Sequence, residues 1–575
     1  MTRKHLLLLM IMIIICGPAM ADDIENATDA VKHMGIGWNL GNTLEANSGN
    51  GQQPTSDAYW GTQGLESETY WGQPTTTQAL IKMMKDAGFG AIRVPVTWYN
   101  HMGKDGNINA AWMKRVHEVV DYVINEGLYC ILNVHHDTGA DGGNFVSWLK
   151  ADKDVYAQRK ARYEKLWTQI ATEFKDYDGH LLFGGYNEML DSYNSWCFAS
   201  FSTPNKYDAT VAASAYDAIN SFGQSFVDAV RATGSNNRQR NLILNTYASG
   251  CGAGSWNSHL LDPLKEMKMP KGESNHIIFE VHSYPSISSL SGAKKELVQN
   301  IKDLKTYLAA KGGPVIFGEF GTSSNNGDGT NDYNNNRTNL FDFLTYFVQQ
   351  TKANGMACFY WMGLTDGIYR SMPTFNQPDL AECLVKAYRG NTDGFSYPGP
   401  DTTSPTTVFE GEKALAWGSG ITVPASAFST YGEGVTMTVS FKVTGDGDDI
   451  QFLYGDWSPK PSCTIDGSSY QDYNPSAHGV TKGSSGTIDV TFPTNVYKQL
   501  TQKGLIMQGI GVTITKVVCH QVTTSITGPT IHNATTSHTD GSATAATPYY
   551  NMQGQRVATS RHGVYIHNGR KVIIR

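Results

Sequence analysis

The chain has 575 residues, 40% of them hydrophobic and 17% charged, which excludes a disordered or fibrous protein. Its length leaves room for roughly two to four domains. The formal net charge is -7, and Lys and Arg are spread along the chain, so the basic patch of a nucleic-acid-binding protein is missing. We expect a monomer with neither a nucleic-acid partner nor a membrane span.

The first 21 residues have the layout of a secretory signal peptide. Arg3 and Lys4 precede an apolar run over residues 6–16, and Ala19 and Ala21 frame a small-residue cleavage site. The apolar run is too short for a comfortable membrane span. The sequence therefore predicts a protein that is secreted or held at the cell surface.

Seven cysteines remain after residue 21, and none has CxxC spacing. Cys130 and Cys358 fall within apolar runs, where a buried free thiol is the expected state. A disulfide between Cys197 and Cys251 is an alternative for two of the others, because both lie in expected loops.

Eight short apolar runs alternate with amphipathic stretches in the first two thirds of the chain. Each run is rich in β-branched or aromatic residues and is too short for a helix. Strands that alternate with helices predict a parallel sheet with helices packed against it. The runs cover residues 35–42, 91–96, 128–136, 181–188, 241–249, 276–284, 314–320 and 356–361.

The stretches between the runs carry helix start and stop signals. Residues 75–89 begin with threonines and stop at Gly88, residues 109–128 begin at Asn109, and residues 294–313 place leucines on one stripe. Eight such units predict a (β/α)8 TIM barrel over residues 22–390. A doubly wound open sheet is the alternative.

The amino-acid composition changes after residue 390. Residues 391–406 are rich in Pro, Gly, Ser and Thr and predict a linker. The strand-like runs that follow show no helical period between them, which predicts a β-sandwich over residues 407–522. These runs cover residues 437–443, 450–454, 487–492 and 505–518.

The β-sandwich has two open interpretations, a carbohydrate-binding module or a spacer. Its aromatic residues either form a stacking surface for sugar or belong to the core and turns. The residues concerned are Tyr454, Trp457, Tyr470 and Tyr473.

A second low-complexity linker covers residues 523–547, and a tail covers residues 548–575. Asn568-Gly569 in the tail predicts a β-hairpin, because this dipeptide suits a two-residue turn.

Polar and ionisable residues gather where the apolar runs end. The carboxyl ends of barrel strands meet on one face, so residues far apart in sequence are expected to line one pocket. Two glutamates, Glu188 and Glu319, are the minimal apparatus for cleaving a glycosidic bond, since one acts as an acid while the other attacks or activates water. The other strand-end residues are Arg93, His135, His136, Asn187, His282, Tyr284 and Trp361.

The motifs GWNLGNTLEA, IRVPVTW, NVHHD, YNEMLDSYNSW, FEVHSY, VIFGEFG and FYW together resemble glycoside hydrolase family 5, the retaining endo-β-glycanases of the cellulase and mannanase type. The resemblance covers residues 31–388 and implies Glu188 as acid/base and Glu319 as nucleophile. It implies supporting roles for Arg93, His135, Asn187, His282, Tyr284 and Trp361. Weaker candidates for glycan contacts are Trp38, Asn39, Trp71, Trp98 and His136.

The resemblance implies a retaining endo-β-1,4-glucanase that needs no cofactor or metal and acts on cellulose-like or mixed-linkage β-glucan. Xyloglucan and mannan are alternative substrates, because Met189 and Met362 depart from common cellulase versions of their loops. Other classes remain open: a non-catalytic surface glycan-binding protein, or a metal-dependent hydrolase built on His135, His136 and Asp137. The tail resembles C-terminal sorting or attachment segments of secreted Bacteroidetes proteins.

The two glutamates are expected to differ in protonation. Arg93 and Tyr284 near Glu319 predict a lowered pKa for the nucleophile, and aromatic surface near Glu188 predicts a raised pKa for the acid. For a retaining enzyme, the two carboxyl groups are expected ~5–5.5 Å apart.

Overall fold

The chain forms two compact units in the computed structural model, Met1–Pro400 and Asp401–Arg575. No helix among the described residues has both the length and the apolar character needed to cross a membrane. The predicted signal peptide, the linker at 523–547, Cys197 and the turn Asn568-Gly569 lie outside the described residues. The structure describes residues 24–47, 62–139, 147–193, 207–252, 258–325, 330–399, 405–429, 431, 435–458, 460–470, 472–521, 549–550, 556–557, 563–567 and 570–574.

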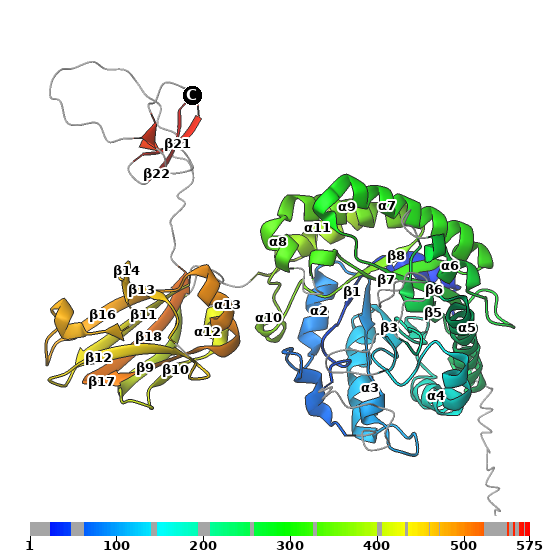
Figure 1. Ribbon diagram of the computed structural model, residues 1–575, viewed down its shortest axis with the longest axis horizontal. Coiled ribbons are helices and arrows are strands. Elements are labelled where there is room, and N and C mark those ends of the chain that lie inside the picture. The colour runs from blue at the N-terminus through cyan, green and yellow to red at the C-terminus, as the bar shows by residue number, and fades with distance from the viewer. Residues whose placement is uncertain are drawn as a thin grey trace, which may run out of the picture. The chain divides into compact units, whose positions relative to one another are not determined.

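The first unit is a closed barrel of eight parallel strands that pair in chain order, with β1 paired to β8 (Figure 1). The predicted (β/α)8 barrel is therefore confirmed, and the open sheet is wrong. Every apolar run contains one strand. The strands are β1 Ile36–Asn39, β2 Ala91–Val94, β3 Tyr129–Asn133, β4 Leu181–Gly184, β5 Leu242–Asn245, β6 Ile277–Ser283, β7 Val315–Phe320 and β8 Ala357–Tyr360.

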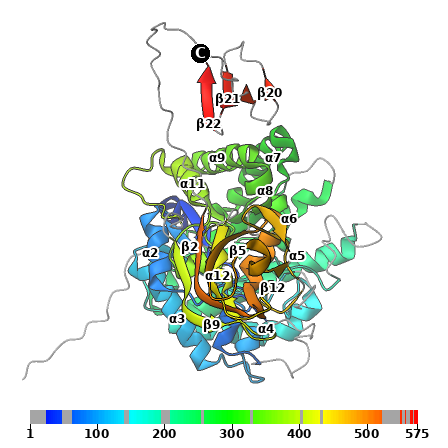
Figure 2. The same ribbon diagram turned by 90° about the vertical axis from the view of Figure 1, so that its left-hand side faces the viewer.

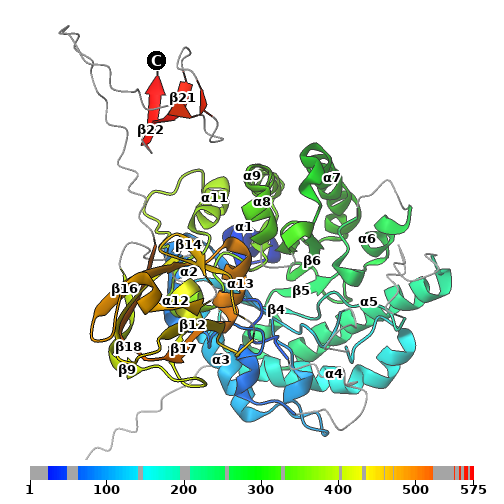
Figure 3. The same ribbon diagram turned by 60° about the vertical axis from the view of Figure 1, so that its left-hand side comes forward.

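Helices surround the barrel, and α7, α9 and α11 pack side by side along one flank (Figure 3). The expected caps are present, because Thr77 accepts the N–H of Leu80 before α2 and Asn109 accepts that of Ala111 before α3. The helices are α1 Ala27–Met34, α2 Gln78–Asp86, α3 Ala110–Asn125, α4 Lys153–Glu173, α5 Ala209–Ala232, α6 Asp262–Glu266, α7 Leu290–Asp303, α8 Thr330–Asn335, α9 Arg337–Ala353, α10 Ile368–Ser371 and α11 Pro378–Arg389.

The barrel has two cores. Branched side chains such as Ile131, Ile243 and Ile316 fill its interior together with the apolar face of α1, which includes Val31. A larger core lies between the strands and the surrounding helices. The packed interior fixes the strands, so the residues at their carboxyl ends are held on a rigid support.

The predicted linker at 391–406 is wrong over its first part. Ser396 donates its N–H to Asp86, Phe375 donates its N–H to Pro398, and the guanidinium of Arg389 lies over the ring of Phe395. Residues 391–399 therefore pack against the barrel. Their Pro, Gly and Ser content reflects turns rather than a free connection.

The second unit contains two antiparallel sheets that share one core, as the predicted β-sandwich requires. The four-stranded sheet has the order β10-β17-β12-β15, and the six-stranded sheet has the order β14-β13-β16-β11-β18-β9. The strands are β9 Thr406–Ala414, β10 Ile421–Val423, β11 Val435–Val443, β12 Asp449–Tyr454, β13 Cys463–Ile465, β14 Ser468–Tyr470, β15 Asp472–Tyr473, β16 Ser485–Thr491, β17 Leu505–Ile510 and β18 Val512–Gln521.

The sandwich differs from its prediction in two respects. It contains the helices α12 Ala425–Ser429 and α13 Thr494–Lys503, although no helical pattern was expected. The run over 505–518 is two strands, because Gly511 turns the chain with a φ of 64°. Helix α13 places Leu500 in the shared core, so its stability comes from packing rather than from a strong sequence pattern.

Two of the four aromatic residues proposed to stack on sugar belong to the core. Tyr454 and Tyr473 are 6% and 5% exposed. Trp457 is half exposed, and the side chain of Tyr470 is outside the description. Of the two open interpretations, Tyr454 and Tyr473 therefore follow the one that assigns them to the core.

The tail forms a small sheet of the order β20-β19-β21-β22 (Figure 2). Strand β21, Gly563–His567, pairs antiparallel with β22, Arg570–Ile574, so the predicted hairpin is present. The other two strands are β19 Tyr549–Tyr550 and β20 Arg556–Val557.

Candidate active site

Polar side chains from the strands and their following loops meet at the carboxyl end of the barrel. A pocket of about 330 Å³ opens there. The pocket contains both glutamates singled out from the sequence, although they are 131 positions apart, at 188 and 319. Its lining consists of His135, His136, Asn187, Glu188, Tyr284, Glu319, Thr322, Ser323 and Trp361.

Arg93 on β2 is fully buried beneath the pocket and holds several groups at once. Nη1 donates to Oε1 of Glu319 at 2.9 Å and to Oδ1 of Asn39 at 3.0 Å. Nη2 donates to Oδ1 of Asn187 at 2.7 Å and lies 2.9 Å from Oε1 of Glu280. Since a guanidinium offers five donors in a fixed plane, it sets the relative positions of these side chains.

Glu319 reaches the pocket because β7 contains a bulge. Val281 pairs with Phe317 and His282 pairs with Glu319, so Gly318 is the extra residue. Ile316 and Glu319 face the barrel interior, whereas Phe317 and Phe320 contact Phe347 outside.

Three groups secure the bulge and the glutamate. Nδ2 of Asn39 donates to the carbonyl of Gly318 at 3.0 Å. Oη of Tyr284 donates to Oε2 of Glu319 at 2.7 Å, and Arg93 holds the other carboxylate oxygen. Glu319 is 5% exposed, so both of its oxygens are fixed by donors in a largely buried site.

Glu188 lies in a strained loop after β4. Its φ is 42°, a left-handed value that a side chain bearing a Cβ rarely adopts. The neighbouring Ala248 and Ser249 are also left-handed, with φ of 54° and 50°. The N–H of Glu188 donates to Oγ of Ser249 at 3.3 Å, and Ala248 donates to the carbonyl of Met189. Such strain is typical of functional sites, because the surrounding structure must hold it in place.

His282 lies between the two glutamates. Its Nδ1 is 2.6 Å from Oε1 of Glu188 and 3.6 Å from Oε2 of Glu319. Its Nε2 is 3.1 Å from Oε1 of Glu280. Burial lowers the pKa of His282, but the charge of Glu319 and the bonds to the other two carboxylates outweigh burial and raise it to about 10. The imidazole is therefore protonated at neutral pH and donates from both nitrogens.

Glu280 was missed by the sequence analysis, although it is central to the site. It lies on β6 with 1% exposure and binds both Arg93 and His282. A Cβ on Gly318 would come within 2.0 Å of its Oε1, so the glycine provides the space for this carboxylate. The available signal was the spacing, because residues 280 and 282 share one face of a strand.

His135, His136 and Tyr284 are neutral, unlike the protonated His282. Burial lowers the pKa of His135 well below its usual value and that of His136 to about 4. Burial raises the pKa of Tyr284 well above its usual value, so its hydroxyl stays a donor to Glu319. His135 stacks on Trp361, with ring centroids 5.8 Å apart and planes 3° from parallel.

The glutamate pKa directions are the reverse of those expected from the sequence. Burial alone would raise the pKa of Glu188, but the hydrogen bond and charge of His282 outweigh it and lower the pKa. Burial raises the pKa of Glu319, although the charges of His282 and Arg93 oppose the rise. The reason is the placement of His282, which donates to Glu188 rather than to Glu319.

Several expected glycan contacts are structural instead. Trp38 and Trp98 are 0% exposed, and their Nε1 groups donate to the carbonyls of Met362 and Asn133. Asn39 is also fully buried and serves Gly318 and Arg93, as described above. These three residues therefore cannot touch a ligand in this structure.

Trp71 contacts a residue of the pocket lining, because its ring lies 5.3 Å from that of His136.

The metal alternative built on His135, His136 and Asp137 fails on the geometry of Asp137. Its carboxylate accepts the N–H groups of Trp98 and Tyr99 at 2.8 and 2.9 Å and Nε1 of Trp148 at 2.6 Å. Asp137 therefore shapes the loop after β3. A different group, Glu188, His282 and Glu319, places one ligand atom from each within 4.8 Å of the others, but His282 would first have to lose its proton.

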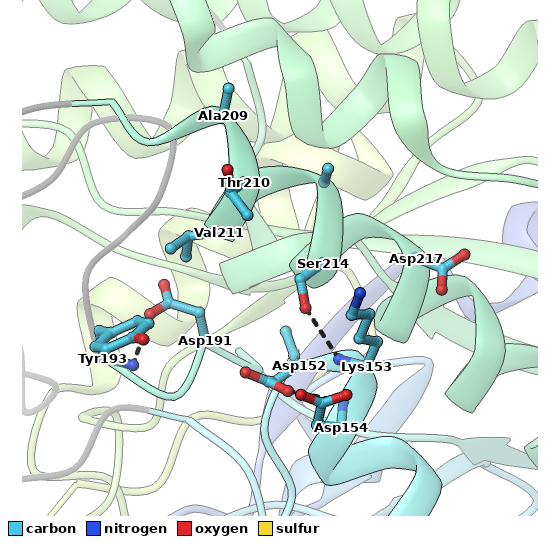
Figure 4. A pocket seen from close by; sticks show the side chains of 12 residues that line it. Asp152, Lys153, Asp154, Asp191, Tyr193, Ala209, Thr210, Val211, Ser214 and Asp217 are labelled. Atoms are coloured by element: carbon cyan, nitrogen blue, oxygen red, sulfur yellow. Dashed lines mark hydrogen bonds between the residues drawn. The ribbon is translucent and has the colours of Figure 1, made fainter.

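A larger cavity of about 690 Å³ lies between the first turns of α4 and α5 (Figure 4). Two of its carboxylates serve local structure. Asp152 caps α4 by accepting the N–H of Asp154, and Asp191 accepts the N–H of Tyr193 and the hydroxyl of Tyr247. The paired glutamates at the barrel strand ends line the smaller pocket instead.

A (β/α)8 barrel with paired glutamates at its strand ends, beside an aromatic face, defines a glycoside hydrolase. The model of the Cellulase family (glycosyl hydrolase family 5) matches residues 50–365. The chain belongs to this family.

Relatives support the assignment. A solved GH5-4 broad specificity endoglucanase from an uncultured bacterium is 55% identical with a TM-score of 0.60, and the match covers 64% of this chain and 97% of that one. A family 5 enzyme from Prevotella bryantii B14, solved with a xyloglucan tetradecasaccharide, is 40% identical with a TM-score of 0.54 over 64% of this chain and 99% of that one. Endoglucanase A of Clostridium longisporum is 31% identical over 395 residues, 64% of this chain and 67% of that protein.

Proposed function

We propose that the chain is a retaining endo-β-1,4-glucanase that cleaves internal bonds of cellulose-like and mixed-linkage β-glucans. The observation that carries the proposal is the glutamate pair, which offers oxygens within 4.8 Å of each other from unlike settings. Retaining enzymes place their carboxyl groups ~5–5.5 Å apart, whereas inverting enzymes need ~6.5–9.5 Å to admit a water. One oxygen of each glutamate within 4.8 Å of the other leaves less room than an inverting enzyme needs for its water, which supports double displacement.

In the first step, Glu319 is the nucleophile. A carboxylate oxygen forms a bond to the anomeric carbon while the bond to the leaving oxygen breaks and that oxygen takes a proton from Glu188. Arg93 and Tyr284 hold Glu319 in position, so little reorganisation is needed during attack. Its fixed, buried setting suits a nucleophile.

In the second step, Glu188 is the base. It accepts a proton from water, the water oxygen bonds to the anomeric carbon, and the bond to Glu319 breaks. The Glu188 side chain is 37% exposed whereas that of Glu319 is 7% exposed, so Glu188 is the residue that can exchange protons with solvent between turnovers.

The proton for the leaving group belongs to the Glu188–His282 pair rather than to Glu188 alone. The two side chains are 2.6 Å apart, so one proton can move between Nδ1 and Oε1. This arrangement explains how Glu188 serves as an acid although its pKa is lowered in the resting site. Glu280 holds the other nitrogen and keeps the ring in orientation.

The pocket walls provide sugar contacts. Trp361 presents an aromatic face on the pocket wall, where a pyranose ring can stack. Asn187 also lines the pocket, and because Arg93 holds its oxygen, its amide nitrogen remains to donate to a sugar hydroxyl.

Xyloglucan is the second candidate substrate. The Prevotella bryantii enzyme that is 40% identical was solved with a xyloglucan oligosaccharide, and the 55% identical endoglucanase is described as having broad specificity. Mannan is a third substrate to include in the test. We also propose secretion, which the basic and apolar pattern of the first 21 residues supports.

The test is product analysis with the full chain on carboxymethylcellulose, barley β-glucan, xyloglucan and mannan. We expect internal cleavage of the glucans, new reducing ends that first appear in the β-configuration by NMR, and no loss of activity in chelator. First-formed α-products would overturn retention, and binding without new reducing ends would favour a non-catalytic glycan-binding protein.

A further inference from the structure

Two tryptophans in the second unit are exposed to solvent. Trp417 and Trp457 are each 51% exposed. Among the described residues of the barrel unit, Trp38, Trp98 and Trp167 are 0% exposed. A half-exposed indole leaves a large apolar face in water, so two of them in one module point to a contact surface.

Both tryptophans lie in loops that contact the four-stranded sheet. Trp417 lies in the turn before β10, and the N–H of the next residue, Gly418, donates to Oε1 of Gln508 on β17 at 2.8 Å. Trp457 lies in the loop after β12. This loop continues to Lys460, whose Nζ binds the carboxylate of Asp472 on β15 at 2.6 and 2.8 Å. The two tryptophans therefore belong to loops that flank this sheet, one next to β10 and β17 and the other reaching the edge strand β15.

The side chains of Gln508, Gln451 and Asp472 form a row of polar groups across this sheet. Nε2 of Gln508 donates to Oε1 of Gln451 at 2.7 Å, and Nε2 of Gln451 donates to Oδ1 of Asp472 at 2.9 Å. Gln451 is the register partner of both other residues, so the row runs across the strands, which lie ~4.8 Å apart. Their sequence neighbours Phe452, Met507 and Tyr473 are in the core, which places the row on the outer face.

The row is held in place but not saturated. A primary amide has two N–H donors and an oxygen with two lone pairs, so Gln451 and Gln508 retain hydrogen-bonding capacity after these contacts. Leu453, which pairs with Ile506 beside the row, adds a partly exposed apolar side chain to the same face, whereas Ile506 itself is 5% exposed. Fixed amides, one ion pair and flanking indoles form a surface suited to a flat molecule with many hydroxyl groups.

The outer face of the six-stranded sheet has a different character. Lys442 pairs with Glu412 at 2.7 Å, and Lys516 pairs with Glu410 at 3.3 Å. These are exposed ion pairs, which belong to a solvated surface. Among the described residues, the outer face of the six-stranded sheet thus carries exposed ion pairs at positions where the four-stranded sheet carries the amide row.

We propose that the outer face of the four-stranded sheet binds a β-1,4-linked glucan chain at a site separate from the catalytic pocket. The indoles of Trp417 and Trp457 would stack on the apolar faces of sugar rings, and Gln508, Gln451 and Asp472 would bond to hydroxyl groups at the ring edges. The choice of glucan rests on the proposed function of the barrel. Because both units belong to one chain, binding here raises the local concentration of substrate at the barrel.

The test uses the full chain carrying Glu319→Gln, which prevents digestion, in native gels that contain barley β-glucan or hydroxyethylcellulose. We expect Trp417→Ala and Trp457→Ala to weaken retardation about tenfold each, and Gln451→Ala to weaken it severalfold. Lys442→Ala on the other sheet is the matched control and should change nothing. The double tryptophan variant measures the retardation that the catalytic pocket contributes.

Two further measurements separate this site from the pocket and from misfolding. In the active chain, the tryptophan variants should keep wild-type kcat on a short soluble cello-oligosaccharide, which reports on the barrel alone. Glucan should quench tryptophan fluorescence of the Glu319→Gln chain, and the conservative Trp417→Phe change should reduce that quenching while the melting temperature stays constant.

Three outcomes would overturn the proposal. Unchanged retardation in both tryptophan variants would remove the site, as would an equal loss in Lys442→Ala. A change in oligomeric state without a change in retardation would assign the face to contacts between copies of the chain. If the active wild type cleaves no glucan but the face still binds one, the proposed function fails while this inference stands.

Discussion

The barrel and the sandwich use the same residue types in opposite ways. The barrel buries Arg93, Glu280 and Trp38 almost completely, whereas the sandwich leaves Lys442 and Trp417 in water. Burial strengthens electrostatic interactions, so it gives the barrel fixed protonation states and a positioned nucleophile. Exposed groups of the sandwich remain available to bind a partner, but they lack the fixed protonation states and positions that catalysis requires. Catalysis and binding thus have different requirements for solvent access.

The largest expected effect tests the claim that the barrel carries the catalytic residues. Glu188→Gln and Glu319→Gln should each lower kcat on β-glucan by more than about a thousandfold, because each removes a group that forms or breaks a bond. Circular dichroism should stay unchanged, since the glutamine has nearly the same shape. Retention of a tenth of wild-type turnover in either variant contradicts the assignment.

The second prediction compares two tryptophans directly. Trp38→Ala should lower the free energy of unfolding by about 3–5 kcal/mol, because it empties a fully buried site. Trp417→Ala in the sandwich should change it by less than about 0.5 kcal/mol. Urea denaturation of the full chain measures both. Equal costs would show that the two units do not differ in the way their tryptophans are used.

The third prediction concerns Glu280, a buried carboxylate that does not line the pocket. Glu280→Gln should lower kcat about 10–100-fold with little change in KM, since Glu280 acts through Arg93 and His282. The alkaline limb of the kcat profile should move to lower pH, because His282 loses one of the charges that raise its pKa. Glu410→Gln, which breaks an exposed pair, is the control. A rise in KM with normal kcat would contradict this positioning role.

The smallest predicted effect is a pH dependence of stability in the barrel. The pKa of His282 is raised from 6.5 to about 10 by folding, so its contribution is complete below pH 6.5 and disappears as pH rises through about 10. The difference in unfolding free energy between wild type and His282→Gln should therefore shrink between pH 6.5 and 10. A difference that grows over this range would show that the imidazole is neutral in the folded protein.

Sequence patterns predicted the barrel well because each strand and helix is encoded locally. The alternating runs, the cap at Asn109 and the glutamates at 188 and 319 all follow from short-range rules and from the topology of a parallel barrel. They did not predict α13, whose Leu500 is held by the sandwich core rather than by a strong helical pattern.

The electrostatics of the site were less predictable, because they depend on contacts between side chains that are far apart in the sequence. The pKa directions of the two glutamates follow from which carboxylate His282 faces, and strand spacing does not specify this. The burial of Trp38 likewise depends on Met362, more than 300 positions away in the chain. The spacing of Glu280 and His282 indicates that they share one face of a strand, but it does not show that Glu280 also binds Arg93, which lies on another strand.

The bulge at Gly318 determines where Glu319 lies and also leaves room for Glu280. A regular β7 would place position 318, not position 319, on the inner face; the additional residue moves the inward-facing glutamate ~3.3 Å further toward the mouth of the barrel. The same glycine leaves the space that Glu280 fills. Positions 280, 318 and 319 are therefore expected to covary as a unit in evolution, and grafting this site onto another barrel would require transferring all three together.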